Sequence, residues 1–335
     1  MNKFERGLLA KAKALHKTLV FPEAAFSTRT VNACKFLAKK KIAKVILIGD
    51  ESALMLSHKR LDKCVIINPK TSVHKDELAS ELYELRKGKG LTMEEANRLI
   101  LDPFYFSTML LNKGLVDGIV AGAESPTATT LRPALQIIKA KEKGGLISSC
   151  FVMTGKNKML GKNPAILLAD CGVNISPTSE ELAKICSSTI ETSIKLGLNV
   201  PKVAFVSFST LGSASGIEVE KVQKAVAIAT EKHPDLIVEG EMQIDAAMVK
   251  SVAETKAPKS RLKGEANILI FPDLQSGNIA YKIMQRFGNL NAYGPIIQNL
   301  KKPVNDLSRG CTVEEIEIVA AITALQCDSK GEEKW

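Results

Sequence analysis

Runs of β-branched and other apolar residues alternate along the chain with longer stretches in which apolar residues recur at helical spacing. The apolar runs predict nine strands, at residues 18–21, 44–48, 65–68, 117–121, 149–153, 165–170, 203–209, 235–239 and 267–272. Amphipathic helices are predicted between most of these strands. This alternation of strand and helix indicates an α/β fold with largely parallel sheets covered by helices.

One predicted helix, residues 179–196, carries its own start and stop signals. Thr178 and Glu181 have the spacing of a capping box, and Gly197 is a residue type that commonly ends helices. Residues 1–17 interleave charges with apolar residues at helical spacing and lack an apolar core followed by a small-residue cleavage site. They predict a first helix rather than a signal peptide.

The length of 335 residues favours two domains, at about 150 residues per domain. A predicted helix ends at residues 139–145, KAKEKGG, in charged residues followed by two glycines, and this marks a domain break. The chain is expected to return from the second domain to the first near residues 293–303, so that the last predicted helix, residues 314–326, packs on the first domain. The predicted domains are residues 1–141 together with 298–335, and residues 142–297.

Composition places the chain among ordinary soluble proteins. Hydrophobic residues make up 45% and charged residues 24%, and no apolar run approaches the roughly 20 residues of a membrane span. The seven cysteines are odd in number and form no CxxC, which predicts reduced thiols in the cytoplasm. The four histidines lie far apart in the sequence and give no metal-site signature.

The net charge of +10 is concentrated at one end of the chain. Residues 1–60 contain 13 Lys or Arg against 4 Asp or Glu, which accounts for +9. A basic segment can attract nucleic acid, a membrane surface or a polyanionic small molecule, although lysines on solvated helix faces are the commoner explanation. Aromatic residues are only 5% and no basic motif is interleaved with them, so we expect no nucleic-acid partner.

The segment 303–311, PVNDLSRGC, is the main candidate for chemistry. Ser308 and Arg309 precede Thr312 and Glu315, which have capping-box spacing, so the pair lies just ahead of a helix N-terminus that favours anions. Ser308 lies in no GxSxG elbow, so it is a hydrogen-bond donor rather than a nucleophile. Asn305 is a further candidate phosphate ligand. Glu315 has two possible roles, general base or helix cap, and the spacing favours the cap.

Other anion-binding candidates are spread along the chain. Arg132 and Arg86 can each hold a phosphate or carboxylate with two parallel hydrogen bonds, although a surface ion pair is the commoner role of a single arginine. The loop 207–216, SFSTLGSASG, is either an anion cradle or a plain turn between a strand and a helix. Residues 155–162, GKNKMLGK, miss the P-loop spacing, and no GxGxxG follows a strand, so nucleotide and dinucleotide sites are not predicted.

Six ordered blocks of sequence carry a resemblance to a known family. The blocks are residues 102–123, 130–139, 168–174, 206–216, 266–286 and 294–316. They resemble phosphate acetyltransferases over nearly the whole chain. The resemblance implies two α/β domains like those of isocitrate dehydrogenases with an active-site cleft between them, and acetyl transfer between phosphate and coenzyme A. It also implies a homodimer, coenzyme A as substrate, no tightly bound cofactor and no catalytic metal.

The resemblance assigns roles to individual residues. Ser308 and Arg309 match the family's serine and arginine, and Arg86 and Arg132 match its two other active-site arginines. The family's general base is an aspartate seven residues after the serine, a position held here by Glu315. Glutamate keeps the carboxylate but adds a methylene, so it must meet the thiol from a different distance.

Two further departures from the family bear on the acyl group. Asn299 stands where glycine is expected, and Glu124-Ser125-Pro126 replace histidine and small polar residues. They leave a butyryl or propionyl transferase as the nearest alternative, because only the acyl pocket differs. A nucleic-acid-binding protein and a metal-dependent decarboxylating dehydrogenase on the similar fold are more remote alternatives.

Overall fold

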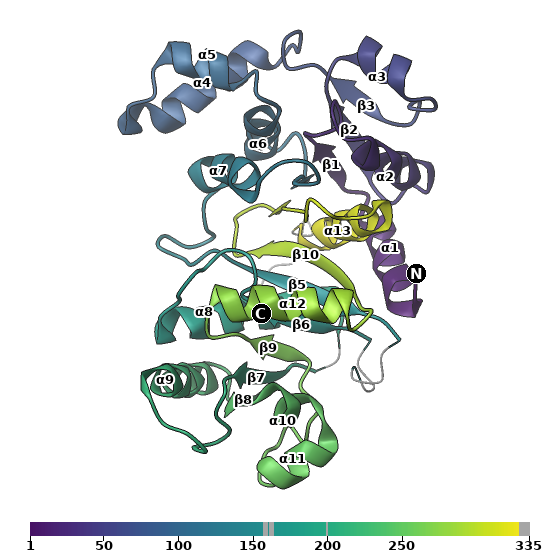
Figure 1. Cartoon of the computed structure of the whole chain (residues 1–335). Helices are drawn as coiled ribbons and strands as arrows, with labels where there is room; N and C mark the ends of the chain where they lie inside the picture. The colour runs from purple at the N-terminus through teal and green to yellow at the C-terminus, as the bar shows by residue number, and fades with distance from the viewer. Residues whose placement is uncertain (157–159, 161–163, 199, 328–335) are drawn as a thin grey trace. The chain divides into compact units, whose positions relative to one another are not determined.

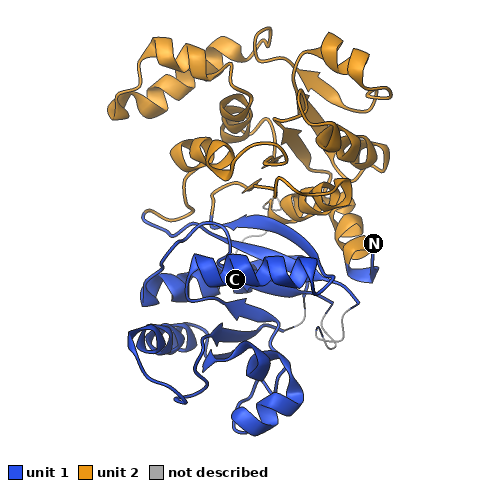
Figure 2. Ribbon diagram, viewed as in Figure 1, with its two compact units in different colours: residues 1–4, 144–299 blue, residues 5–143, 300–335 orange. Residues whose placement is uncertain are grey.

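The computed structural model describes residues 1–156, 160, 164–198 and 200–327 (Figure 1). The chain forms two compact units, residues 1–4 with 144–299 (unit 1) and residues 5–143 with 300–335 (unit 2; Figure 2). The boundaries predicted from the sequence, 141/142 and 297/298, each differ from these by two residues. Most of the segment 155–162 and the terminal residues 328–335 lie outside the described residues.

Unit 2 is built on a five-stranded sheet in the order β11-β4-β1-β2-β3. The strands are β1 (Thr18–Phe21), β2 (Lys44–Ile48), β3 (Val65–Ile67), β4 (Gly118–Val120) and β11 (Val304–Asn305). Every neighbouring pair is parallel, with Thr18 opposite Lys44 and Val304 opposite Ile119. The chain runs from β1 through β2 to β3 and then returns to the other side of β1 as β4. The direction of winding therefore reverses between β1 and β4.

The helices of unit 2 connect these strands. They are α1 (Lys3–Leu15), whose first two residues group with unit 1, α2 (Thr28–Lys39), α3 (Glu51–Ser57), α4 (Lys75–Arg86), the short 3₁₀ helix η1 (Lys87–Lys89), α5 (Met93–Leu99), α6 (Pro103–Lys113), α7 (Thr127–Ile137) and α13 (Val313–Gln326). Helix α13 packs against α2 and β4. Its residues 316–324 are all buried. The last helix is thus part of the core of unit 2.

Unit 1 contains a six-stranded sheet in the order β10-β5-β6-β9-β7-β8. The strands are β5 (Ser148–Thr154), β6 (Ile166–Ala169), β7 (Lys202–Val206), β8 (Ile237–Met242), β9 (Ile268–Ile270) and β10 (Asn291–Gln298). Strand β5 is antiparallel to both of its neighbours, and the remaining pairs are parallel.

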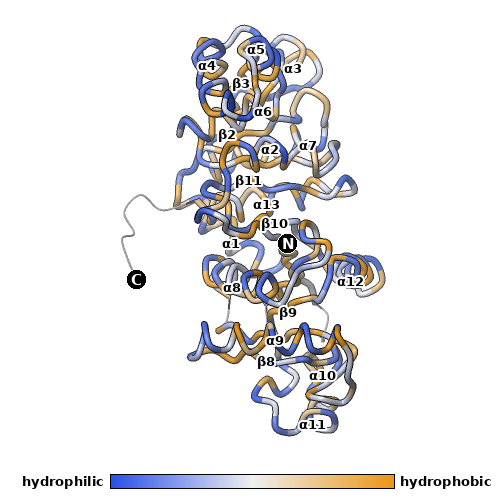
Figure 3. Tube along the Cα trace, turned by 90° about the vertical axis from the view of Figure 1, so that its left-hand side faces the viewer, coloured by the Kyte–Doolittle hydropathy of each residue, from blue (hydrophilic) through white to orange (hydrophobic). Residues whose placement is uncertain are grey.

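The helices of unit 1 bury one face each against this sheet or each other. They are α8 (Ser179–Leu196), α9 (Ile217–Lys232), α10 (Ile244–Met248), α11 (Lys250–Lys256) and α12 (Leu274–Arg286). Hydrophilic and hydrophobic colours alternate along α9 in Figure 3, as expected for a helix that buries one side. In the core, the rings of Phe151 on β5 and Tyr281 on α12 stack with their centroids 3.8 Å apart.

The predicted α/β class with largely parallel sheets is confirmed, and all nine predicted strands are present with small differences at their ends. Helix α8 begins and ends as predicted, with the Thr178 and Glu181 capping box and Gly197 in the left-handed conformation. Strands β10 and β11 were not predicted. Both are edge strands next to prolines, β10 containing Pro295 and β11 following Pro303, and proline reads as a break in a strand pattern. Among the described residues, no helix is long and apolar enough to cross a membrane.

Candidate active site

The carboxyl edge of the unit 2 sheet gathers an unusual set of polar side chains. In open α/β sheets, ligands bind beyond the carboxyl ends of strands where the winding reverses, which here is between β1 and β4. Glu23 follows β1, the loop 122–125 follows β4, and Asp306 to Ser308 follow the neighbouring strand β11. The PVNDLSRGC segment therefore ends at the place where the fold favours a ligand.

The Ser308–Arg309 turn leads directly into helix α13. The backbone N–H of Cys311 donates to the carbonyl of Ser308 at 2.8 Å, which closes the turn. Ser308 is half-buried and Arg309 is exposed. The capping box is present as predicted: the backbone N–H of Glu315 donates to Thr312 Oγ1 at 3.2 Å, and the N–H of Thr312 donates to Glu315 Oε2 at 3.0 Å. Glu315 is thus fixed at the start of the helix, seven residues after Ser308.

Arg29, on helix α2, ties this turn to the loop after β4. Its guanidinium donates to the carbonyls of Cys311 at 2.6 Å and Arg309 at 3.1 Å. On the other side it donates to the carbonyl of Ala123 at 2.6 Å and pairs with the carboxylate of Glu124 at 2.8 Å. The hydrogen bond that Arg29 donates to Glu124 is the main cause that raises the pKa of Arg29. Only an arginine fork presents enough donors in one plane to join these segments.

Asp306, two residues before Ser308, is a fully buried carboxyl group. Its Oδ2 accepts a hydrogen bond from the hydroxyl of Thr127, the first residue of α7, at 2.6 Å. Burial raises the pKa of Asp306 to about 6, and the hydrogen bond from Thr127 opposes part of the rise. Asp306 therefore joins the Ser308 turn to the start of α7, the helix that carries Arg132.

The two arginines predicted to bind anions, Arg132 and Arg86, both affect the pKa of one tyrosine. Arg132 is exposed on α7, and Arg86 is half-buried at the end of α4. Burial raises the pKa of Tyr105, and the positive charges of Arg132 and Arg86 both oppose that rise. The hydroxyl of Tyr105 donates to Gln136 Oε1 at 2.9 Å. The fold thus brings the two arginines, far apart in sequence, to the neighbourhood of Tyr105.

Asn305 does not suit the phosphate-binding role that its sequence position suggested. Its side chain is fully buried at the end of β11. Its amide nitrogen donates to Thr323 Oγ1 at 2.8 Å and to Gln326 Oε1 at 2.6 Å, both on α13. An amide held in this way fastens the last helix to the edge strand and is not available to a bound anion.

The loop 207–216 in unit 1 favours the plain-turn alternative. The N–H groups of Leu211 and Gly212 donate to the backbone carbonyl and the carboxylate of Glu241 at 2.9 and 2.7 Å. The N–H groups of Thr210 and Ala214 donate to serine hydroxyls of the same loop. Donors used inside the protein cannot bind an external anion, so this loop is not a phosphate cradle.

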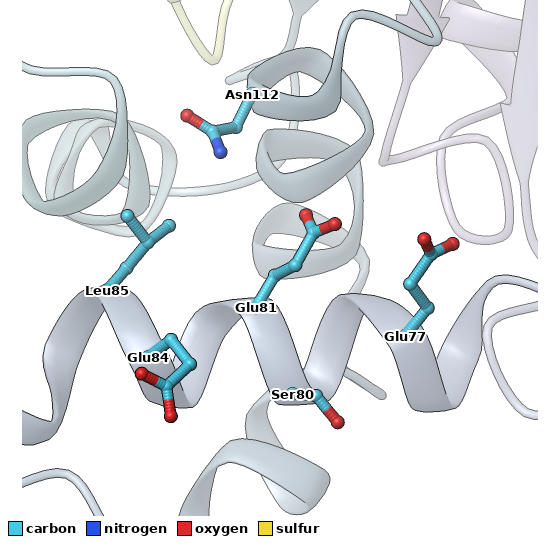
Figure 4. Close-up of a pocket in the computed structure, with 6 residues that line it drawn as sticks. All are labelled: Glu77, Ser80, Glu81, Glu84, Leu85 and Asn112. Atoms are coloured by element: carbon cyan, nitrogen blue, oxygen red, sulfur yellow. The ribbon is translucent and has the colours of Figure 1, made fainter.

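A surface pocket of about 470 Å³ in unit 2 has the wrong charge for an anionic substrate. Figure 4 shows its lining residues, Glu77, Ser80, Glu81, Glu84, Leu85 and Asn112. The ammonium of Lys113 pairs with Glu77 and Glu81, and its hydrogen bond is the main cause that lowers the pKa of Glu77. This pocket contains none of the predicted site residues.

Sequence reasoning missed Glu23, Arg29, Asp306 and Thr127. Glu23 carries a usable signal, because it is a carboxylate two residues after the end of a predicted strand. Asp306 follows β11, a strand that the sequence did not predict, so its position gave no such signal. Arg29 and Thr127 carry none, since their partners lie far away in the sequence. Arg29, for example, bonds to residues 280 and 282 positions later.

Comparison with known proteins identifies the chain. Residues 3–324 match the model of the family described as phosphate acetyl/butaryl transferase. The chain belongs to this family. A phosphate acetyltransferase from Thermoanaerobacterium thermosaccharolyticum is 46% identical over 323 residues, which cover 96% of this chain and 98% of that protein. The prediction of the family is therefore confirmed.

Solved structures show that proteins outside this family share the fold of the chain. A phosphotransacetylase from Streptococcus pyogenes superposes with a TM-score of 0.86 and 42% identity, covering 97% of this chain and 99% of that one. A 4-hydroxythreonine-4-phosphate dehydrogenase from Klebsiella pneumoniae superposes with a TM-score of 0.53 at 12% identity, covering 93% and 100%. The second likeness shows the fold alone, and it confirms the dehydrogenase-like fold class.

Proposed function

We propose that this chain transfers an acetyl group reversibly between acetyl phosphate and coenzyme A. The 46% identity to a phosphate acetyltransferase over nearly both full lengths supports this activity. The structural observation that carries it is the Ser308–Arg309 turn, which runs into a helix whose first turn holds the carboxylate of Glu315. A hydroxyl, a guanidinium and a carboxylate then stand within eight residues at the carboxyl edge of a parallel sheet.

The proposed mechanism uses each of these groups once. Glu315 accepts the proton of the coenzyme A thiol, whose reference pKa is about 8.5, and the thiolate attacks the carbonyl carbon of acetyl phosphate. The tetrahedral intermediate carries an oxyanion that the Ser308 hydroxyl stabilises by donating a hydrogen bond. The bond between the acyl carbon and the phosphate oxygen then breaks, giving acetyl-CoA and inorganic phosphate. Arg309, Arg132 and Arg86 hold the departing phosphate by charge.

Glu315 can be tested separately as base and as cap. Glutamine keeps the capping-box hydrogen bond but cannot accept a proton. We expect Glu315→Gln to unfold within about 0.5 kcal/mol of the wild type and to lose about 100-fold or more in kcat, since general bases contribute about 10²–10⁴. Glu315→Ala should lose the activity and also about 1 kcal/mol of stability, the usual contribution of a cap. A Glu315→Gln enzyme within a few-fold of wild-type activity would leave this residue as a cap only.

Arg132 is proposed to bind the phosphate of the acyl donor. Hydrogen bonds between charged groups contribute about 1.5–3 kcal/mol, so Arg132→Ala should raise the KM for acetyl phosphate by about 10- to 100-fold. Arg98→Ala, at an exposed arginine of α5, is the matched control and should leave this KM unchanged. Initial rates of thioester formation at varied acetyl phosphate measure both. An equal response of the two variants would remove Arg132 from the phosphate site.

The acyl preference, assembly and location complete the proposal. Following thioester formation from coenzyme A with acetyl, propionyl and butyryl phosphate separates the acetyl enzyme from its longer-chain relatives. We propose coenzyme A as a substrate, with no tightly bound cofactor, and a homodimer, as the family resemblance implies; sedimentation velocity measures the assembly. The cysteines within residues 1–156, 164–198 and 200–327 are all free thiols, which supports a cytoplasmic location.

A further inference from the structure

Glu23 makes a concentrated set of hydrogen bonds for a carboxylate that the proposed chemistry does not use. It follows β1 by two residues and is fully buried. Its Oε2 accepts the backbone N–H groups of Gly122 at 2.8 Å and Ala123 at 2.7 Å. Its Oε1 accepts those of Glu124 at 3.2 Å and Ser125 at 2.9 Å. Four consecutive N–H groups of the loop after β4 thus converge on one anion.

Consecutive N–H groups that converge in this way form an anion-binding concavity, and such concavities hold phosphate in many α/β proteins. Here the chain fills the concavity with its own carboxylate. The loop lies where the winding of the sheet reverses, which is also where a ligand is expected. A substrate phosphate is therefore excluded from these backbone donors and depends on side chains, in keeping with the arginines of the proposed site.

The loop that Glu23 shapes also packs tightly against the Ser308 segment. Gly122 has φ +100°, a conformation that favours glycine, and a Cβ added there would lie 2.6 Å from the backbone nitrogen of Leu307. One residue further on, Ala123 accepts a hydrogen bond from Arg29, which also holds Arg309 and Cys311. Any change in the loop is thus transmitted to the turn that carries Ser308.

The charge of Glu23 also affects groups that lie close to the Ser308 turn. Burial is the main cause that raises the pKa of Asp306 and of Cys311, and the negative charge of Glu23 adds to both rises. The same charge raises the pKa of Arg29, after the larger effect of Glu124. Glu23 therefore acts on three groups near Ser308, two of them in the segment 303–311 and the third on α2.

We propose that Glu23 is a positioning residue for acyl transfer, a fixed internal anion that folds residues 122–125 and thereby aligns the Ser308–Arg309 turn. This role rests on the proposed function, in which Ser308 and Arg309 act on the acyl phosphate. It predicts that the anion can be supplied from solution when the side chain is removed.

The test is chemical rescue of Glu23→Ala by formate. Truncation leaves four N–H groups without their acceptor and opens room for a small carboxylate. We expect the variant to lose about 30-fold or more in kcat, with a smaller change in the KM for coenzyme A, because misplacing catalytic groups costs on the order of 10²-fold. Sodium formate should raise both its melting temperature and its kcat at least several-fold, whereas sodium chloride at equal ionic strength should not.

Controls separate this role from general destabilisation. Wild type and Glu94→Ala, at an exposed glutamate of α5, should show no response to formate. Formate that restores the melting temperature but not kcat would overturn the positioning role, as would a Glu23→Ala enzyme within threefold of wild type. If Glu23→Ala does not fold, Glu23→Gln keeps the side-chain volume but turns an NH₂ group toward two of the donors. Wild-type activity in that variant would equally overturn the proposal.

Parallel variants separate a failure of the Glu23 role from a failure of the proposed function. Ser308→Ala and Arg309→Ala are assayed in parallel with Glu23→Ala. Full activity in those two variants would contradict the proposed site. The response of the Glu23→Ala melting temperature to formate would still show whether the loop binds a free carboxylate.

Discussion

At the scale of single residues, buried carboxylates dominate the region around Ser308. Glu23 is stabilised by four backbone donors, whereas Asp306 bonds the Thr127 hydroxyl and has a second oxygen, Oδ1, with no hydrogen-bond partner among the described residues. A buried charged oxygen without a partner costs free energy. Asp306 is therefore the carboxylate in this region whose ionisation works against folding.

This difference predicts a pH effect on stability. The folded pKa of Asp306, about 6, lies above the unfolded value of about 3.9, so the native state binds more protons in between. Its contribution to stability is fully present below the unfolded pKa and is lost as the pH rises through 6. Between pH 5 and 8 the wild type should lose about 1 kcal/mol relative to Asp306→Asn. Urea unfolding of both proteins across this range measures it, and parallel curves would contradict it.

At the scale of elements, the sequence revealed the local signals but not the long-range ones. The capping boxes of α8 and α13 lie within four residues, so their spacing was visible in the sequence. The Ser308–Arg309 turn before a helix start was visible for the same reason. The hydrogen bonds between Glu23 and residues 122–125 were not visible in the sequence. They join groups about 100 positions apart that meet only when β1 and β4 become neighbours. Local patterns thus predict elements, and topology determines which of their ends meet.

The turn after β10 shows how a departure from the family can be explained structurally. Asn299 has φ +65°, the left-handed region, in which glycine is unstrained and asparagine is the best tolerated alternative. Its side-chain amide also donates to the carbonyl of Leu146 at 2.9 Å. Asparagine therefore replaces the expected glycine without a large conformational cost.

This explanation predicts the effect of two substitutions. Asn299→Gly loses one hydrogen bond but gains conformational freedom at positive φ, so its unfolding free energy should stay within about 1 kcal/mol of the wild type. Asn299→Ala loses the hydrogen bond and keeps a Cβ in the left-handed region, which should cost about 1–2 kcal/mol. Thermal and urea unfolding of the two variants rank them. Equal stability of both would show that backbone strain does not govern this turn.

At the scale of the whole molecule, unit 2 is discontinuous in sequence and unit 1 interrupts it. Residues 5–143 lack the edge strand β11 and the core helix α13, which come from residues 300–327. The two chain crossings are adjacent within unit 2, because Ala140 forms a β-bridge with Leu300 and the N–H of Lys301 donates to Lys139 at 3.0 Å. A short linker can therefore replace unit 1 without disturbing the sheet of unit 2.

Fragments provide the test of this organisation. Residues 144–299 contain their own six-stranded sheet and core and should unfold in one cooperative transition by circular dichroism. Residues 5–143 alone should not, because β4 has an unpaired edge and its partner helix is missing. Joining residues 5–143 to 300–327 through a short Gly/Ser linker should restore cooperative unfolding. A cooperative transition in 5–143 alone would show that β11 and α13 are not needed for that core.

Because β11 and α13 come late in the chain, they are also synthesised long after the rest of unit 2. At about 5–20 residues per second, the synthesis of residues 144–299 takes roughly 10–30 seconds. Throughout that interval the first part of unit 2 has been made but lacks the strand and helix that complete its hydrophobic core. Ser308, Arg309 and Glu315 are added only afterwards, so a nascent chain gains its proposed catalytic groups after nearly everything that positions them already exists. Interrupted translation of this message should therefore yield aggregation-prone protein without activity rather than a partly active enzyme.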